Sequence, residues 1–282
     1  MAVTYDYAGK TAIVTGGGTG IGFAIAEELA RAGATVTLMG HRVDQIEPAA
    51  KKLIAAFGAK AIRSSIGDVT QEADMKRAVE TACGADGSLD FAIANAGGGA
   101  PGPIMLLPKE VWDEVLALNV TGTALLIKYA GLAMRQKGGR IVTISSSAAY
   151  QPVKYMSPYS TAKAAVEMLT KSAAIELGPF GINVNCIAPG WIKSEAGLMV
   201  GPDLEKQMTE RTALGDGAPP QVIAHGVLHL CSSHSSFTTG AIVETGGGMH
   251  LYGGEDFTSI CLAVYGEAVK PLMAPSQMVR PG

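Results

Sequence analysis

The stretch YSTAK, residues 159–163, places a tyrosine and a lysine four positions apart, with only small or hydroxyl-bearing residues between them. On a helix, side chains at positions i and i+4 lie on one face and meet. A free phenol has a pKa of about 10, and a neighbouring ammonium lowers that pKa because it favours the phenolate. The pair therefore suits a proton donor tuned by a cation; a solvated polar helix face is the alternative.

A glycine-rich stretch, TGGGTGIG at residues 15–22, joins a β-branched run to a helical pattern. Gly16, Gly20 and Gly22 leave room for a pyrophosphate near the backbone, and the start of the helix supplies amide donors and a positive dipole. A purely structural turn between a strand and a helix would use the same glycines. The position of the stretch, in the first strand–helix–strand unit, favours nucleotide binding.

The second strand-like run ends at Gly40, His41 and Arg42. Sites for NAD usually have an acidic residue near this point, which bonds the ribose 2′-hydroxyl. Arg42 would instead face a 2′-phosphate, because a guanidinium is a planar and permanently charged donor. We therefore expect NADP(H) as the preferred cofactor; NAD(H) is the other candidate, with Arg42 stacked on the adenine.

The elements that must position these residues follow from the pattern of apolar residues. Strand-like runs cover residues 11–15, 35–39, 61–66, 89–94, 140–145 and 182–188, with a seventh at 241–245. Amphipathic helical patterns lie between them, and the longest cover residues 108–136 and 156–180. Buried runs separated by helices of this length indicate βαβ units and a parallel sheet. We predict a Rossmann-type, doubly wound α/β sheet of about seven strands with helices on both faces.

One domain accounts for the whole chain of 282 residues, since no linker-like run divides it before residue 250. The core is expected at about residues 8–250. Residues 191–217 break the rhythm of strands and helices and are interpreted as an inserted helical lobe beside the substrate. Residues 251–282 form a tail that runs past the expected end of the fold.

The composition excludes several classes of protein. A net charge of −3 leaves no basic footprint for nucleic acid. The start of the chain has neither a basic nor an apolar segment typical of a signal peptide, and no run approaches 18 apolar residues, so no membrane span is expected. The four cysteines are scattered without metal-ligand spacing, which favours free thiols, no bound metal and a cytoplasmic location.

The motifs together resemble the short-chain dehydrogenase/reductase family over about residues 8–250. They occur in the order of that family: TGGGTGIG at 15–22, GDV at 67–69, NAG at 95–97, Asn119 in LNVTG, a serine after the fifth strand, YSTAK at 159–163 and APG at 188–190. Each motif alone is weak, but all of them in this order are highly specific.

The resemblance implies a role for each matching position. Tyr159 would exchange a proton with the substrate oxygen, Lys163 would lower the pKa of Tyr159 and bond the nicotinamide ribose, and Ser146 would polarise the substrate carbonyl. Ser146 is chosen over Ser145 and Ser147 because it lies thirteen residues before Tyr159. Asn119 would support a water relay from Lys163 to solvent, although it could instead cap a helix break. The implied cofactor-binding residues are Gly16, Gly18, Thr19, Gly20, Ile21, Gly22, His41, Arg42, Asp68, Val69, Asn95, Ala96, Gly97, Tyr159, Lys163, Pro189, Gly190, Ile192 and Ser194.

The expected function is therefore NADP(H)-dependent interconversion of a carbonyl and a secondary alcohol. Relatives that reduce a C=C bond fit less well, since they have a longer Tyr–Lys spacing or no tyrosine at this place. Two alternatives stay open: a catalytically silent nucleotide-binding or scaffold protein, and a 3-oxoacyl thioester reductase as the specific enzyme. Fold resemblance alone does not settle the substrate.

The candidate substrate walls are apolar and rich in methionine, which favours a hydrophobic ketone or alcohol. They contribute Pro101, Ile104, Met105, Tyr150, Val153, Tyr155, Met156, Trp191, Leu198 and Met199. The resemblance and a surplus of apolar residues on the two longest helices also imply a homodimer or homotetramer. The apolar stretch 257–273 in the tail is expected to pack on this subunit or on a neighbouring one.

Overall fold

The computed structural model describes residues 4–194, 201–251 and 257–266. Seven parallel strands form one sheet in the order β3-β2-β1-β4-β5-β6-β7. The strands are β1 (Thr11–Thr15), β2 (Thr35–Gly40), β3 (Ile62–Ile66), β4 (Phe91–Ala94), β5 (Gly139–Ile144), β6 (Ile182–Pro189) and β7 (Ile242–Thr245). The predicted doubly wound sheet is confirmed, and each predicted strand starts and ends within two residues of the observed one.

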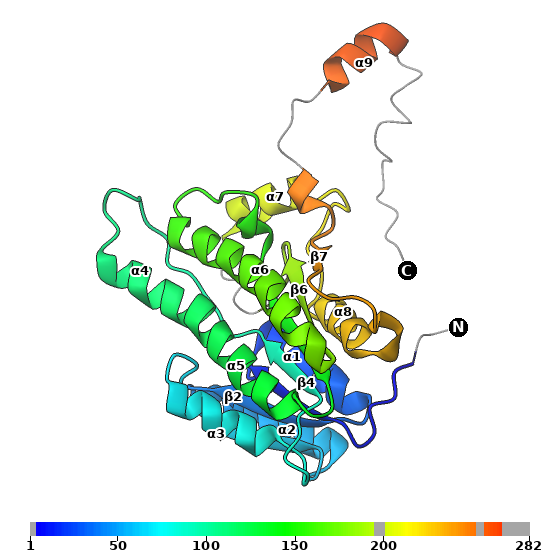
Figure 1. Ribbon diagram of the computed structural model, residues 1–282. Coiled ribbons are helices and arrows are strands. Elements are labelled where there is room, and N and C mark those ends of the chain that lie inside the picture. Colours follow the sequence, from blue (N-terminus) through cyan, green and yellow to red (C-terminus); the bar gives the residue numbers. More distant parts are fainter. Residues whose placement is uncertain (1–3, 195–200, 252–256, 267–282) are drawn as a thin grey trace.

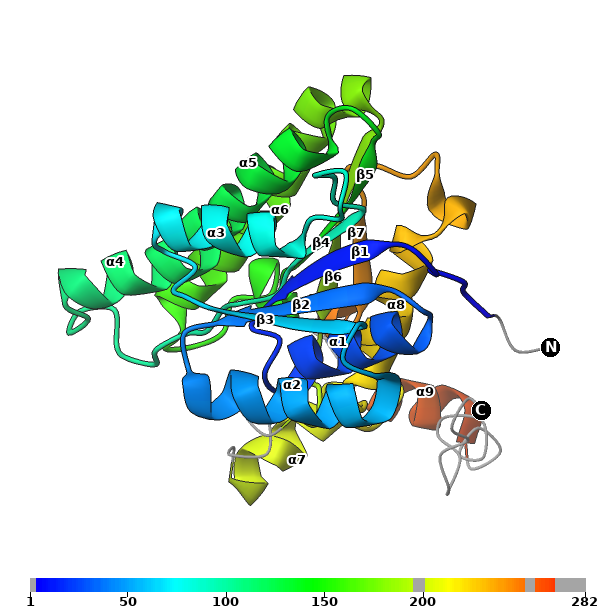
Figure 2. The same ribbon diagram turned by 90° about the horizontal axis from the view of Figure 1, so that it is seen from below.

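Helices cover both faces of the sheet, as Figure 2 shows. One layer holds α1 (Gly20–Arg31), α2 (Val43–Phe57) and α8 (Gln221–Cys231). The other holds α3 (Glu72–Ala82), α5 (Gly122–Met134) and α6 (Ser157–Leu177). Each layer buries its own apolar cluster against the strands, the first with Leu29 and Val227 and the second with Met75 and Leu126. Burial on both faces explains why central strands such as β1 and β4 are buried along their whole length, whereas the edge strands β3 and β7 have exposed positions.

The long helical pattern at residues 108–136 is one helical run with a change of winding in the middle. It consists of α4 (Lys109–Leu116), a π-helical turn η1 (Ala117–Thr121) and α5. By length and composition alone, Lys109–Met134 could cross a membrane. In the fold, its second half packs on the sheet between α3 and α6, so the run has the place of a core helix.

The remaining elements lie mainly beyond the carboxyl ends of the strands (Figure 1). They include η2 (Ser147–Ala149), α7 (Pro202–Glu210), η6 (Met249–Leu251) and α9 (Thr258–Tyr265). At the opposite, amino edge, η3 (Gly178–Phe180) leads into β6 and η5 (Ser233–Ser235) precedes β7. Helix α7 lies in the expected lobe, whereas the lobe residues Leu198 and Met199 lie outside the described part. Helix α8 is absent from the sequence-based prediction, although it packs closely on α1. Of the tail stretch 257–273, only residues 257–266 are described, and Figure 1 draws α9 apart from the two helix layers.

Candidate functional site

The residues singled out in the sequence converge on one edge of the sheet. In a parallel sheet, the segments that follow the strands all leave from the carboxyl edge. The glycine turn follows β1, His41 and Arg42 follow β2, and residues 95–97 follow β4. Strands β1 and β4 are neighbours although they are not consecutive, so the chain reverses its direction of winding between them. Such a switch point is where doubly wound sheets bind ligands.

The glycine turn leaves no room for side chains at two of its positions. A Cβ on Gly22 would lie 2.1 Å from the carbonyl oxygen of Gly16, and one on Gly16 would lie 2.9 Å from Asn95 Nδ2. Gly20 has a φ of 53° and lies against Ser194, where a Cβ would lie 3.3 Å from the serine Cβ. Thr19, which precedes α1, makes no side-chain capping bond to the helix. The open first turn of α1 and the bare backbone fit the phosphates of a dinucleotide.

The other glycine-turn residues support this shape. Gly18 packs on the start of α2, since a Cβ there would lie 3.2 Å from the backbone of Gln45. Ile21 is half-buried against the core on the α1 side of the sheet.

Arg42 occupies the N-terminal cap of α2, and both Arg42 and His41 are exposed at the end of β2. The guanidinium is therefore accessible to a ligand that lies over the carboxyl edge. After β3, Asp68 Oδ1 accepts the amide of Thr70 at 2.9 Å, which fixes the turn. Val69 is buried, and a Cβ on Gly122 would lie 2.9 Å from its Cγ2. Asp68 thus lies at the carboxyl edge of the sheet, where it could contact an adenine ring. Val69 packs on α5.

Asn95 connects the two strands at the switch point. Its Nδ2 donates to the carbonyl of Thr15 at 2.9 Å and to that of Gly16 at 3.3 Å. The hydroxyl of Thr15 in turn accepts the amides of Asn95 and Ala96, each at 3.1 Å. These bonds fix the glycine turn to the end of β4 across the centre of the sheet. The sequence analysis did not include Thr15 among the site residues.

The three serines that follow β5 have different surroundings. Ser145 is buried, and its hydroxyl donates to Glu167 Oε1 at 2.9 Å and to the Lys163 carbonyl at 3.2 Å. Ser146 is half-buried, and its Oγ accepts the amide of Ala148 at 3.2 Å. That bond leaves the proton of the Ser146 hydroxyl available to a substrate oxygen. Ser145 is committed to α6 instead, so the geometry favours Ser146 over this neighbour.

Tyr159 and Lys163 lie one turn apart near the start of α6, as the spacing predicts. Lys163 is buried, with 4% of its surface exposed, and its Nζ donates to the Ile144 carbonyl at 2.9 Å. The Nζ lies 5.5 Å from the centre of the Tyr159 ring. The ammonium is therefore fixed to the end of β5 and faces the phenol, which is itself half-buried.

Asn119 explains the π-helical turn. Its Nδ2 donates to the Val115 carbonyl at 2.8 Å, which is the carbonyl that an α-helical backbone would engage. Nδ2 also donates to the Gly98 carbonyl at 2.7 Å, and Oδ1 accepts the Gly98 amide at 3.2 Å. A Cβ on Gly97 would lie 2.5 Å from Asn119 Oδ1 and 3.0 Å from Lys163 Nζ. The bare backbone of Gly97 thus lies against both side chains.

The segment after β6 completes the cofactor side of the site. A Cβ on Gly190 would lie 2.6 Å from the Cα of Gly246, so two backbones touch there after Pro189. Ile192 is buried and bridges to Ala218, and Ser194 touches the glycine turn. The predicted nicotinamide residues therefore lie opposite the first turn of α1.

Two sequence-based expectations change with the structure. Trp191, expected in a substrate wall, is 4% exposed and packs under Gly217 and Lys193 instead. Glu167 was not expected in the site, yet it bonds Ser145 from the same helix face as Tyr159 and Lys163. Burial raises the pKa of Glu167. The signal for Glu167 is its place four residues after Lys163, which continues the Tyr159–Lys163 spacing.

Comparison with known proteins agrees with this geometry. The family model described as "Enoyl-(Acyl carrier protein) reductase" matches residues 16–250. Human "Dehydrogenase/reductase SDR family member 4" is 38% identical over 245 residues, which are 86% of this chain and 87% of that protein. The chain belongs to the short-chain dehydrogenase/reductase family.

Other members of the family are similar over nearly the same length. The 3-oxoacyl-[acyl-carrier-protein] reductase FabG of Aquifex aeolicus is 35% identical, covering 86% of this chain and 97% of that protein. Cyclohexanol dehydrogenase of a Rhodococcus species is 34% identical, covering 86% and 96%. The structure of L-sorbose reductase from Gluconobacter frateurii, complexed with NADPH and L-sorbose, matches with a TM-score of 0.81 and 30% identity, covering 88% and 99%.

These relatives place the chain among the oxidoreductases of the short-chain dehydrogenase/reductase family that act on carbonyl or alcohol groups with NAD(P). The description of the matching family model names an enoyl reductase, whereas three of the relatives are named as a 3-oxoacyl reductase, a cyclohexanol dehydrogenase and an L-sorbose reductase.

The loop after β4 generates a prediction about Tyr159. A Cβ on Gly99 would lie 2.8 Å from both Tyr159 Cβ and Met156 Cε. Gly99→Ala should therefore displace Tyr159 and lower kcat by about 10- to 100-fold, and the same clash should lower the melting temperature. The matched control is Gly178→Ala at the end of α6, because a Cβ there meets nothing within 4 Å. Steady-state kinetics that give Gly99→Ala the kcat of this control would contradict the prediction.

Proposed function

We propose that the protein is an NADP(H)-dependent oxidoreductase that interconverts a ketone and a secondary alcohol on a fairly hydrophobic substrate. Tyr159 is the general acid and base, assisted by Lys163, Ser146 and Asn119. The observation that carries this proposal is the arrangement at the carboxyl ends of β4 and β5. There a buried lysine, fixed to the Ile144 carbonyl, faces a half-exposed tyrosine one helical turn away.

The proposed chemistry needs one hydride on the substrate carbon and one proton on its oxygen. The nicotinamide cofactor supplies or accepts the hydride when it is bound. Tyr159 gives the proton to the oxygen during reduction and removes it during oxidation. Ser146 keeps its proton but donates a hydrogen bond through it to the same oxygen, which stabilises the charge that develops there. The Lys163 ammonium, 5.5 Å from the centre of the Tyr159 ring, offsets the negative charge left when Tyr159 gives up its proton.

Asn119 is proposed to position other groups of the site rather than to transfer a proton to the substrate. Its side chain fixes the Gly98 backbone and so the loop that lies over Tyr159 and beside Lys163. The proton that Tyr159 loses must be replaced from solvent, and the short path from Lys163 past Asn119 is the proposed route.

The role of Tyr159 predicts a selective loss of turnover. Tyr159→Phe removes only the phenol oxygen, so it should lower kcat by about 100- to 10,000-fold and leave the cofactor dissociation constant nearly unchanged. The measurement is a panel of ketones, secondary alcohols and an acetoacetyl thioester with both cofactors, followed by nicotinamide absorbance. The control is Tyr129→Phe, which loses a surface bond to Glu72 instead. Substantial turnover by Tyr159→Phe would mean that another group moves the proton.

The same panel separates the alternatives. Cofactor binding without turnover of any substrate would favour a catalytically silent protein. A strong preference for the thioester would favour a 3-oxoacyl reductase, the activity named for the Aquifex aeolicus relative.

The preference for NADP(H) rests on Arg42. Its guanidinium is exposed at the end of β2, and residues 40–42 include no acid that would bond a ribose 2′-hydroxyl. Charged hydrogen bonds of this kind are worth about 1.5–3 kcal/mol, or about 10- to 100-fold in affinity. Arg42→Ala should therefore lower the ratio of kcat/KM for NADPH over NADH by that factor.

The matched control for Arg42 is Arg31→Ala. Arg31 is also exposed, but it lies at the far end of α1 and pairs with Glu27 and Glu28. Equal kcat/KM of the wild type with NADH and NADPH would contradict the preference for NADP(H). A wild-type ratio of kcat/KM in Arg42→Ala would show that Arg42 does not determine the preference.

A hydrophobic substrate is supported by the loops around Tyr159. Ile104, Met105 and Val153 are 63%, 90% and 45% exposed, although they lie on loops beside the proposed catalytic residues. Apolar side chains left open at the mouth of a site favour an apolar ligand. The four free thiols also agree with the proposed cytoplasmic location.

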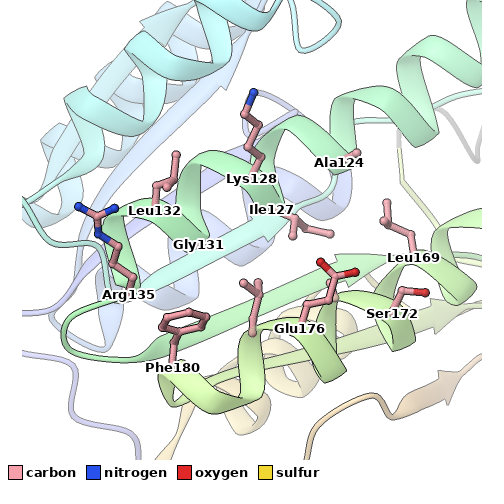
Figure 3. A pocket seen from close by; sticks show the side chains of 12 residues that line it. Ala124, Ile127, Lys128, Gly131, Leu132, Arg135, Leu169, Ser172, Glu176 and Phe180 are labelled. Carbon is pink, nitrogen blue, oxygen red and sulfur yellow. The ribbon is translucent and has the colours of Figure 1, made fainter.

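A homodimer is the proposed minimum assembly, and the α5–α6 face is the proposed interface. A groove of about 610 Å³ lies between these helices, and Figure 3 shows its side chains. Its exposed apolar residues include Leu132 and Phe180, and Ile175 beside them is 79% exposed. Arg135 and Glu176 also line the groove, so the face has charges of both signs, which suits packing against a second copy of itself.

The interface predicts a change of mass in one variant. Ile175→Glu places a charge on the proposed contact without burying it in the monomer, so it should lower the molar mass measured by light scattering towards that of the single chain. Ile54→Glu, at a partly exposed apolar position on α2, is the control and should keep the wild-type mass. Identical masses for both variants would rule out the α5–α6 face as the interface.

A further inference from the structure

Tyr155 has a backbone conformation that its residue type disfavours. Its φ is 67°, and it is the one non-glycine residue in the described ranges with a positive φ. The thirteen other described residues with positive φ are all glycines. A side chain with a Cβ is penalised in this left-handed region, whereas glycine is not.

The backbone hydrogen bonds around Tyr155 explain its positive φ, but they do not explain why a tyrosine rather than a glycine occupies the position. The Tyr155 carbonyl accepts the amide of Gly102 at 2.8 Å, and the Met156 amide donates to the Val153 carbonyl at 3.0 Å. These bonds connect the loop after β4 to the segment between Ser146 and Tyr159. A glycine at position 155 would make the same bonds at lower conformational cost. The chain therefore retains the tyrosine for its side chain.

The Tyr155 side chain contributes little to the packing of the protein. It is 51% exposed, and its ring contact is with the neighbouring Lys154, whose Nζ lies 4.9 Å from the ring centre. Among the described residues, its phenol makes no hydrogen bond. An aromatic ring held open at a conformational cost indicates contact with something outside the fold, and such strain gathers at functional sites.

The position of Tyr155 indicates what that contact is. The segment 147–156 runs over the N-terminal end of α6, where Tyr159 lies, on the side of α7 (Figure 1). Through the bond to Gly102, Tyr155 is joined to the loop that carries the exposed Ile104 and Met105. Tyr155 is thus four residues from the proposed proton donor and adjoins an apolar rim.

We propose that Tyr155 determines substrate specificity: its ring packs on an apolar or aromatic arm that extends several atoms beyond the reacting carbonyl. This inference rests on the proposed ketone–alcohol activity of the same site. It assigns Tyr155 to the substrate rather than to the cofactor, which would lie over the glycine turn after β1.

Three substitutions separate the ring from the backbone. Tyr155→Phe keeps the ring and the strain, Tyr155→Ala keeps the strain and removes the ring, and Tyr155→Gly removes both. Two ketones with the same reacting end serve as probes: 4-phenylbutan-2-one, which has an aromatic arm, and butan-2-one, which has none.

The kinetic expectation is selective. Tyr155→Ala and Tyr155→Gly should both lose about tenfold in kcat/KM for 4-phenylbutan-2-one, the typical effect of an apolar contact. For butan-2-one, and for the KM of NADPH, both variants should stay within about twofold of the wild type, because no arm is lost. Tyr155→Phe should match the wild type on both ketones.

The stability expectation is independent of any activity. Tyr155→Gly should melt at or above the temperature of the wild type and above Tyr155→Ala, because glycine relieves the left-handed strain. If both variants melt clearly below the wild type, the ring serves packing, and the proposal is overturned.

The role of Tyr155 and the ketone–alcohol activity can be contradicted separately. Suppose that the wild type reduces both ketones. The role of Tyr155 alone is then overturned if Tyr155→Gly keeps the wild-type kcat/KM for 4-phenylbutan-2-one, or if it loses kcat/KM equally for both ketones. If the wild type reduces neither ketone, binding is measured instead. Calorimetry in the presence of NADPH should show that 4-phenylbutan-2-ol binds more tightly to the wild type than to Tyr155→Gly. No difference there, or no binding of the alcohol, overturns the proposal for Tyr155 as well.

Discussion

The buried ammonium of Lys163 is the interaction on which the rest of the site depends. Lys163 is the one charged side chain that is buried among the described residues, and a buried charge is costly unless polar groups surround it. Its Nζ donates to the Ile144 carbonyl, faces the ring of Tyr159 and lies beside the bare backbone of Gly97. The polar environment comes from β4, β5 and α6 together. The elements that hold the lysine therefore also fix the distance between Ser146 and Tyr159.

The sheet supplies the second constraint, because its order brings segments far apart in sequence to one edge. Asn95 and Thr15 fix β4 to β1 at the switch point, so the glycine turn is bonded directly to the segment that leads to Gly97, beside Lys163. Ser145 makes a similar connection on the other side, since it binds both the Lys163 carbonyl and Glu167 on α6. A dinucleotide over β1 and β2 would thus meet Tyr159, the proposed proton donor, whose position is set by β5 and α6.

Much of this arrangement could be predicted from the sequence because it depends on local pattern and spacing. The seven strands follow from short buried runs, and Tyr159 and Lys163 meet because α6 has a regular helical repeat. Other features depend on tertiary contacts that no local pattern reveals. At the π-helical turn, the Asn119 side chain takes the Val115 carbonyl and also bonds the distant Gly98 backbone, and Trp191 is buried against Gly217. Helix α8 was missed although its polar residues Gln221, His225 and His229 recur every four positions on the exposed face, which is a local signal for a helix. The conformation of Tyr155, by contrast, depends on a bond to Gly102.

The role of Lys163 can be tested most directly with Lys163→Met, which keeps an unbranched side chain one atom shorter than lysine and removes its charge. Turnover and melting temperature would be measured together on the purified protein. The account predicts that kcat falls by about 100-fold or more, because a preorganised charged donor is lost. It also predicts a melting temperature close to that of the wild type, since an apolar side chain of similar size replaces a buried charge at little net cost. Wild-type turnover by Lys163→Met, or loss of folding, would contradict the claim that the ammonium serves the chemistry of the site.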